Sequence, residues 1–210
     1  MFNFLKSSEV IDKEQALKGR KEVLFTPKSH HYNGRKIQPP WPKNFSRIIV
    51  AMGCFWGVEK MFWKTEGVYI TSVGYSGGFT INPTYEEVCS GATGHSECVE
   101  IIYDSKILPF ENILKLFFES HDPTQGMRQG NDYGTQYRSI VFFNNETEKN
   151  KIISIKEKYQ RNLIINNFGK ITTEVMPLST YYYAEDVHQQ YLSKIPNGYC
   201  AMSGTGVKCI

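Results

Sequence analysis

One cysteine of this chain stands where a polypeptide can make a thiol reactive. Cys54 belongs to the sequence Gly-Cys-Phe-Trp-Gly at residues 53–57, which follows an apolar run and precedes an amphipathic stretch. This order predicts a sharp turn that places Cys54 at the N-terminus of a helix. The unpaired N–H groups and the helix dipole there favour negative charge, and the thiolate is the nucleophilic form of cysteine. We therefore expect the chemistry of this protein to begin with Cys54 as a thiolate.

Two further thiols, Cys200 and Cys209, lie near the C-terminus among several glycines. Terminal glycine-rich segments are mobile, so their thiols can approach a buried thiol and then return to the surface. This arrangement is typical of a disulfide relay, and the alternatives are a structural disulfide, inert thiols or a zinc pair. The zinc pair is disfavoured because the two cysteines lack a short ligand spacing and a matching second pair. We interpret Cys89 and Cys98 as small buried side chains outside the chemistry.

The polar residues are less informative when each is taken alone. Glu97 stands at the start of a predicted strand, where a carboxylate is usually solvated. Residues 121–138 form a long, polar, glycine-bearing stretch between an apolar helix and an apolar strand. Long irregular connections are often functional, so we expect several of these side chains to line a cleft; the alternative is a well-packed loop. The five histidines are dispersed and indicate no metal cluster, and a Cys-His hydrolytic pair with Cys54 would leave the tail unexplained.

Composition limits the classes of protein and partner. The 210 residues are 40% hydrophobic and 14% aromatic, which fits one domain with extensions. The net charge of +3 comes from scattered residues without a basic stripe, so no nucleic-acid partner is expected. We find neither a signal sequence nor a membrane span, and the five cysteines form no dense framework. We expect a cytoplasmic monomer with no membrane partner.

The predicted elements alternate between strands and helices. Strands are expected at residues 47–52, 67–75, 98–103 and 137–143, and helices at 54–64, from 83, at 109–120 and at 146–163. In the first helix Val58, Met61 and Phe62 are expected to be core. The order predicts an α+β fold, a two-layer sandwich with a ferredoxin-like core and a mostly antiparallel sheet.

Three segments are expected along the chain. Residues 1–45 form an irregular N-terminal arm, because the proline-rich residues 38–42 cannot continue a helix or a central strand. Residues 46–195 form the catalytic domain, and residues 196–210 form a mobile tail that carries two cysteines.

Several of these motifs together resemble one family, the peptide methionine sulfoxide reductases of the A class. The resemblance runs from Arg47 to Cys209 and is specific because the motifs are long and in the right order. It rests on residues 53–57, Gly-Tyr-Ser-Gly-Gly at 74–78, Asn-Pro-Thr-Tyr at 82–85, Thr-Gly-His-Ser-Glu at 93–97, residues 121–138, Ala-Glu-Asp at 184–186 and His-Gln-Gln-Tyr-Leu at 188–192.

The resemblance implies reduction of the S epimer of methionine sulfoxide, free or within proteins, for the repair of oxidised proteins. The Cys54 thiolate would attack the sulfoxide sulfur while Glu97 protonates the departing oxygen. A carboxyl that is protonated at neutral pH requires an apolar pocket that raises its pKa.

The resemblance also assigns the surrounding residues. Phe55 and Trp56 would form the apolar wall that receives the methyl group, although aromatic residues at helical spacing would otherwise be read as core. The hydroxyls of Tyr85 and Tyr137 would polarise the sulfoxide oxygen, and Asp132 would support the site.

Recycling of the enzyme follows from the same resemblance. Cys54 would be left as a sulfenic acid, Cys200 would resolve it to a disulfide, and exchange with Cys209 would present that disulfide to thioredoxin. Neither a bound cofactor nor a metal is expected.

The chain departs from the family pattern in the tail and in one motif. Ala201 and Ser203 stand where glycine is common, which bears on the recycling rate, and Val187 replaces a more usual aromatic residue, with a local effect expected. The alternative functions are a thiol peroxidase or general disulfide reductase, which needs no methyl pocket, and a binding module in which Cys54 is merely packed.

Overall fold

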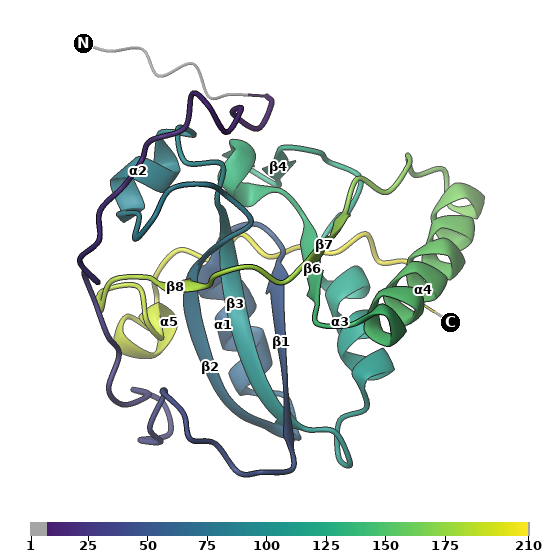
Figure 1. Ribbon diagram of the computed structural model, residues 1–210. Helices are drawn as coiled ribbons and strands as arrows, with labels where there is room; N and C mark the ends of the chain where they lie inside the picture. Colours follow the sequence, from purple (N-terminus) through teal and green to yellow (C-terminus); the bar gives the residue numbers. More distant parts are fainter. Residues whose placement is uncertain (1–7, 210) are drawn as a thin grey trace.

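The centre of the molecule is a six-stranded sheet with the strand order β7-β6-β1-β3-β2-β8 (Figure 1). This computed structural model describes residues 8–209. The neighbouring strands are antiparallel except for the parallel pair β6 and β7. The predicted combination of helices with a mostly antiparallel sheet is therefore confirmed. The strands are β1 (Phe45–Ala51), β2 (Val68–Ser76), β3 (Ser96–Asp104), β6 (Ile140–Phe143), β7 (Glu174–Pro177) and β8 (Tyr182–Tyr183).

Three helices cover one face of this sheet. They are α1 (Phe55–Trp63), α3 (Phe110–Ser120) and α4 (Glu146–Ile165). Alternate strand residues such as Val50, Val99 and Ile101 point to this side because successive side chains of a strand face opposite ways. They form the main core together with Val58 and Phe62 of α1, while Met61 is only partly buried.

The opposite face is covered by extended chain. Ile37 and Trp41 of the N-terminal arm pack against Ile70 and Ile102, and Trp41 donates a hydrogen bond from its indole N–H to the Ile37 carbonyl at 2.8 Å. Further along the sheet, residues of the 176–181 segment pack against a second cluster. The arm thus buries apolar surface that the sheet would otherwise expose. The division into arm, domain and tail stays a prediction.

The remaining elements are short and lie around the edge of the sheet. They are α2 (Tyr85–Cys89), α5 (Tyr191–Lys194), the 3₁₀ helix η1 (Thr135–Tyr137) and the pair β4 (Arg128–Gln129) and β5 (Asp132–Tyr133). No helix within residues 8–209 combines the length and apolar character that crossing a bilayer requires.

The strand predicted at residues 137–143 begins later than expected. Tyr137 lies in η1, because the Ser96 hydroxyl donates to the carbonyls of Gln136 and Arg138 and the chain joins the sheet only at Ile140. Glu97 is the second residue of β3, paired in register with Tyr75, so its predicted place at the start of a strand is confirmed.

Candidate functional site

Cys54 is the N-cap of α1, at the turn that follows β1. Its backbone is non-helical, with φ −54° and ψ 121°, and Gly53 before it has φ +90°, which an L side chain rarely adopts. A Cβ on Gly53 would also stand 2.6 Å from Cβ of Gln129. The structure therefore has the predicted sharp turn with the cysteine at a helix N-terminus.

Glu97 lies beside this turn and is almost completely buried. Its side chain is 1% exposed, and Oε2 accepts a hydrogen bond from the Phe55 N–H at 3.0 Å. Burial raises the pKa of Glu97 to about 8, the Phe55 hydrogen bond opposes this, and the charge of Asp132 adds to it. Glu97 is therefore a buried carboxyl that holds its proton near neutral pH, in contrast to the solvated carboxylate that its position alone suggested.

Burial and neighbouring charges act on the thiol of Cys54. Burial raises its pKa well above the usual value, a negative charge on Glu97 would raise it further, and a hydrogen bond from the Trp56 backbone lowers it. Ionisation of Cys54 is therefore opposed by burial, and the expected thiolate stays a prediction.

Aromatic side chains form a wall next to Cys54. Phe55 is buried and Trp56 is partly buried, and the Trp56 ring stacks on Tyr191 with centroids 4.1 Å apart. The His188 ring lies 5.9 Å from Trp56, 5.5 Å from Phe55 and 4.3 Å from Tyr85. Such a wall can receive a small apolar group.

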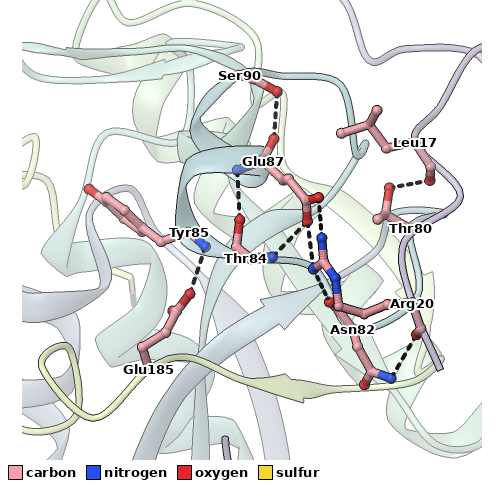
Figure 2. Close-up of polar contacts among 9 residues, drawn as sticks. All are labelled: Leu17, Arg20, Thr80, Asn82, Thr84, Tyr85, Glu87, Ser90 and Glu185. Atoms are coloured by element: carbon pink, nitrogen blue, oxygen red, sulfur yellow. Dashed lines mark hydrogen bonds and ion pairs between the residues drawn. The ribbon is translucent and has the colours of Figure 1, made fainter. Parts of the chain in front are cut away.

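Tyr85 is held at the first turn of α2 by a set of polar contacts (Figure 2). Thr84 and Glu87 form a reciprocal capping box, and Glu185 accepts the Tyr85 N–H at 2.8 Å. The Arg20 guanidinium of the arm donates two hydrogen bonds to the Glu87 carboxylate, from Nη1 to Oε2 at 2.9 Å and from Nη2 to Oε1 at 2.5 Å. The arm therefore braces the helix that carries Tyr85.

Tyr137 and Asp132 come from the long polar stretch of residues 121–138. Burial and then the charge of Glu97 raise the pKa of both Tyr85 and Tyr137, so these phenols remain hydrogen-bond donors. Asp132 accepts a hydrogen bond from the Tyr199 hydroxyl at 3.0 Å. Part of this stretch thus adjoins the site.

The rest of the stretch is a packed loop. His121 is buried and lies 2.7 Å from the Phe117 carbonyl and 2.7 Å from the Ser139 hydroxyl. Arg138 is also buried and donates to the carbonyls of Thr135 and Gly94. The packed-loop alternative therefore holds for this part of residues 121–138, and the lining of a cleft by the other side chains stays a prediction.

The tail crosses the first turn of α1. A Cβ added to Gly57 would stand 3.0 Å from Sγ of Cys200 and 2.8 Å from Cγ of Met202. Glycine at position 57 therefore allows the close approach, and the Cys200 thiol contributes to the raised pKa of Cys54. Cys200 is exposed, which suits a thiol that must move.

Cys209 lies apart from the other predicted residues. It is 5% exposed and packs with the main core, and its N–H donates to Glu119 of α3 at 2.7 Å. The Tyr159 hydroxyl of α4 lies 2.8 Å from that of Thr205. In this structure the tail rests on α3 and α4, and its mobility stays a prediction.

Sequence reasoning assigned no role to some residues of the site. His188, Tyr191 and Glu185 belong to motifs that carry the resemblance, and that was the only available signal. Cys98 is buried as expected, whereas Cys89 is only half-buried and shares a hydrogen bond with the Tyr85 hydroxyl. Among residues 8–209, no three His, Cys, Asp or Glu side chains are grouped to hold a metal ion.

Comparison with known proteins gives a consistent result. The family described as peptide methionine sulfoxide reductase matches residues 46–208. The mitochondrial peptide methionine sulfoxide reductase of Homo sapiens is 51% identical over 203 residues, which are 97% of this chain and 86% of the human protein. Methionine sulfoxide reductase A of Corynebacterium diphtheriae superposes with a TM-score of 0.86 at 43% identity, covering 91% of this chain and 93% of that chain. Mxr1 from Saccharomyces cerevisiae in complex with Trx2 shares the fold, with a TM-score of 0.54 at 24% identity over 80% of this chain and 96% of that chain.

Proposed function

This chain belongs to the peptide methionine sulfoxide reductase family and reduces methionine sulfoxide, and on that premise we propose that Cys54 and Glu97 carry the reaction on the S epimer. The observation that supports these roles best is the buried Glu97 carboxyl, which accepts the Phe55 N–H next to Cys54. A protonated acid, a thiol and an aromatic wall then meet at one helix N-terminus.

In the first step the sulfur of Cys54 attacks the sulfoxide sulfur. The Cys54 proton and the Glu97 proton are available to the sulfoxide oxygen, so the S–O bond polarises as the thiol becomes nucleophilic. Phe55 and Trp56 hold the methyl group, and the hydroxyls of Tyr85 and Tyr137 donate to the oxygen, with Asp132 in support. The oxygen takes up both protons and leaves as water, which leaves the Cys54 sulfur bonded to the sulfur of a methionine sulfonium. Water then attacks the Cys54 sulfur, the sulfur–sulfur bond breaks, methionine leaves, the released proton returns to Glu97, and Cys54 becomes a sulfenic acid.

Recycling then uses the tail. The Cys200 thiol attacks the sulfenic sulfur and water leaves, which forms a Cys54–Cys200 disulfide. The Cys209 thiolate attacks the sulfur of Cys200 and releases Cys54 as a thiol. Thioredoxin reduces the Cys200–Cys209 disulfide, a role supported by the complex of the yeast relative with Trx2.

Finer features of the molecule belong to the same proposal. The consecutive strands β1, β2, β3 and β6 lie in the order β6-β1-β3-β2 with helices on one face, which supports a ferredoxin-like, two-layer core. We also propose that the protein is a monomer without nucleic-acid or membrane partners and works in the cytoplasm; the human relative is named as mitochondrial, so cell fractionation is the test of location.

The test is reduction of the two separated sulfoxide epimers of a blocked methionine, with dithiothreitol or with thioredoxin and its reductase. Loss of the S epimer alone with both reductants is expected. Cys54→Ser should abolish the reaction, and Cys200→Ser should stall with thioredoxin after one turnover. Activity on neither epimer would return the thiol peroxidase alternative, and full activity of Cys54→Ser would overturn the role of Cys54.

A further inference from the structure

A second buried carboxyl lies on the helix that Cys54 begins. Glu59 of α1 is 0% exposed and has no part in the proposed chemistry. Its Oε2 accepts the Gln190 N–H at 2.8 Å, and its Oε1 accepts the Gln190 side-chain amide at 2.7 Å and the Thr71 hydroxyl at 3.1 Å. Burial raises the pKa of Glu59 to about 7. Burying a carboxyl costs free energy and adds little stability. We therefore look for the role of Glu59 in the residues that it binds.

What Glu59 holds is an uncommon backbone conformation. Gln190 has φ 48° and ψ 41°, a left-handed region that residues with side chains seldom occupy. This residue lies between His188 and Tyr191, whose rings both stack on Trp56. The conformation of Gln190 therefore sets where these two rings stand against Trp56.

The neighbouring contacts fix the orientation of the Gln190 amide. Its Oε1 accepts the His31 N–H of the arm at 3.0 Å, so its NH₂ group faces Glu59. Gln189 is fixed separately to β2, because its NH₂ group donates to the Val73 carbonyl at 2.7 Å. Glu59 is thus the acceptor that completes the anchoring of residues 188–191.

We propose that Glu59 is a positioning residue that determines specificity: through Gln190 it fixes the spacing between Trp56 and the rings of His188 and Tyr191, and hence the size of the S-alkyl group that the site accepts. This inference rests on the proposed function, which places the methyl group of the sulfoxide against Trp56.

An exchange of acid and amide tests the contact. Glu59→Gln preserves the volume, but whichever way the new amide turns, its NH₂ group faces a donor of Gln190, either the backbone N–H or the side-chain NH₂. The double exchange Glu59→Gln with Gln190→Glu restores a donor opposite an acceptor, still accepts the His31 N–H and leaves Thr71 a partner. The matched control is Glu100→Gln, which alters another buried carboxyl, bonded to Arg47 and Ser72 on the opposite side of the sheet.

The readout is the ratio of kcat/KM values for the S epimers of blocked methionine sulfoxide and blocked ethionine sulfoxide, with dithiothreitol as reductant. One methylene in an apolar pocket changes such a ratio by about 10–200-fold. We expect Glu59→Gln to lower the methyl-to-ethyl ratio by on the order of tenfold and to raise KM for the methyl substrate. The double exchange should restore the ratio, and Glu100→Gln should leave it unchanged, whatever its effect on thermal unfolding.

The inference is overturned if Glu59→Gln has the same methyl-to-ethyl ratio as the unsubstituted protein. It is also overturned if the double exchange changes this ratio as much as Glu59→Gln alone does. If Glu59→Gln does not fold, Gln190→Leu removes the same amide contact with little change in volume and carries the same expectation. Unsubstituted protein that reduces neither sulfoxide would refute the proposed function itself, whereas an active enzyme with unchanged selectivity in the variants refutes only the role of Glu59.

Discussion

The proton on Glu97 predicts a pH dependence for the first chemical step. With a pKa of about 8, raised by burial, the acid form is present at neutral pH and is lost as the pH rises through about 8. We expect the single-turnover rate of methionine formation to fall along this limb. Glu97→Gln should lower the rate by at least about 10²-fold and remove the limb.

Glu100→Gln again provides the control, because it changes a buried carboxyl of the same strand that faces Arg47 and Ser72. Its pH profile should match that of the unsubstituted protein. The same alkaline limb in Glu97→Gln would assign the titration to another group.

Glu97 also links stability to pH. Its folded pKa of about 8 exceeds the ordinary value of 4.5, so its stabilising contribution is fully present below pH 4.5 and is lost as the pH rises through about 8. The loss is on the order of a few kcal/mol. Thermal unfolding should show Glu97→Gln gaining stability relative to the unsubstituted protein between pH 5 and pH 8.5; a constant difference across this range would contradict the assignment.

Residue types and spacing were enough to single out Cys54 and the two tail thiols. Cys54 follows a predicted turn at a helix N-terminus, and the tail thiols lie in a glycine-rich terminal segment. Residue types and spacing did not lead to Glu97, since burial depends on strand register and on contacts distant in sequence. The raised pKa of Cys54 could not be predicted for the same reason: the helix N-terminus is visible in the sequence, but the burial of the thiol is not.

At the scale of elements, the brace on α2 predicts an effect of the arm on catalysis. Arg20→Gln removes the paired contacts with Glu87, and Tyr85 on the same helix should lose its fixed position (Figure 2). The pair is partly exposed and screened by solvent, so we expect only a small loss in unfolding free energy. Steady-state kinetics should show kcat/KM reduced by a few fold, which corresponds to about 1 kcal/mol or less.

Arg20→Lys is the matched control, because it keeps the charge but cannot make the paired contact. It should fall between the unsubstituted protein and Arg20→Gln. Reduced stability with unchanged kcat/KM in Arg20→Gln would show that the brace does not reach Tyr85.

The longer elements could be predicted from their periodicity, and α3 and α4 were placed within two residues. The strands β7 and β8 and the helix α5 were missed because each is only two to four residues long and is fixed by neighbours distant in the chain. Tyr137, the last residue of η1, was predicted as strand because the apolar run of β6 follows closely, and the Ser96 contacts that prevent pairing are not local.

At the scale of the whole molecule, the passage of the tail over α1 predicts an unusual result for Gly57→Ala. Alanine favours a helix by about 1 kcal/mol over glycine, yet its Cβ would meet Met202 at 2.8 Å and Cys200 at 3.0 Å. We expect the tail to be displaced, so that the Cys54 sulfenic acid persists longer. A sulfenic-acid probe in a single-turnover experiment should detect it.

The rate of methionine formation in that single turnover should stay unchanged, since it precedes the tail step. Ser203→Ala is the control within the tail, as Ser203 is exposed. Equal sulfenic-acid lifetimes in Gly57→Ala and in the unsubstituted protein would contradict the close approach.

The burial of Cys209 bears on the order in which the oxidised substrate and the reductant bind to this enzyme. While the chain is reduced, Cys209 is packed against α3 and α4 and its N–H is bonded to Glu119, so a reductant finds no disulfide and no exposed outer thiol to meet. In the proposed relay, the tail leaves those helices only after Cys54 has been oxidised and Cys200 has formed a disulfide with it. If the proposed relay operates, oxidised substrate and reductant bind different forms of the enzyme and do not compete, and steady-state kinetics should then show a ping-pong pattern.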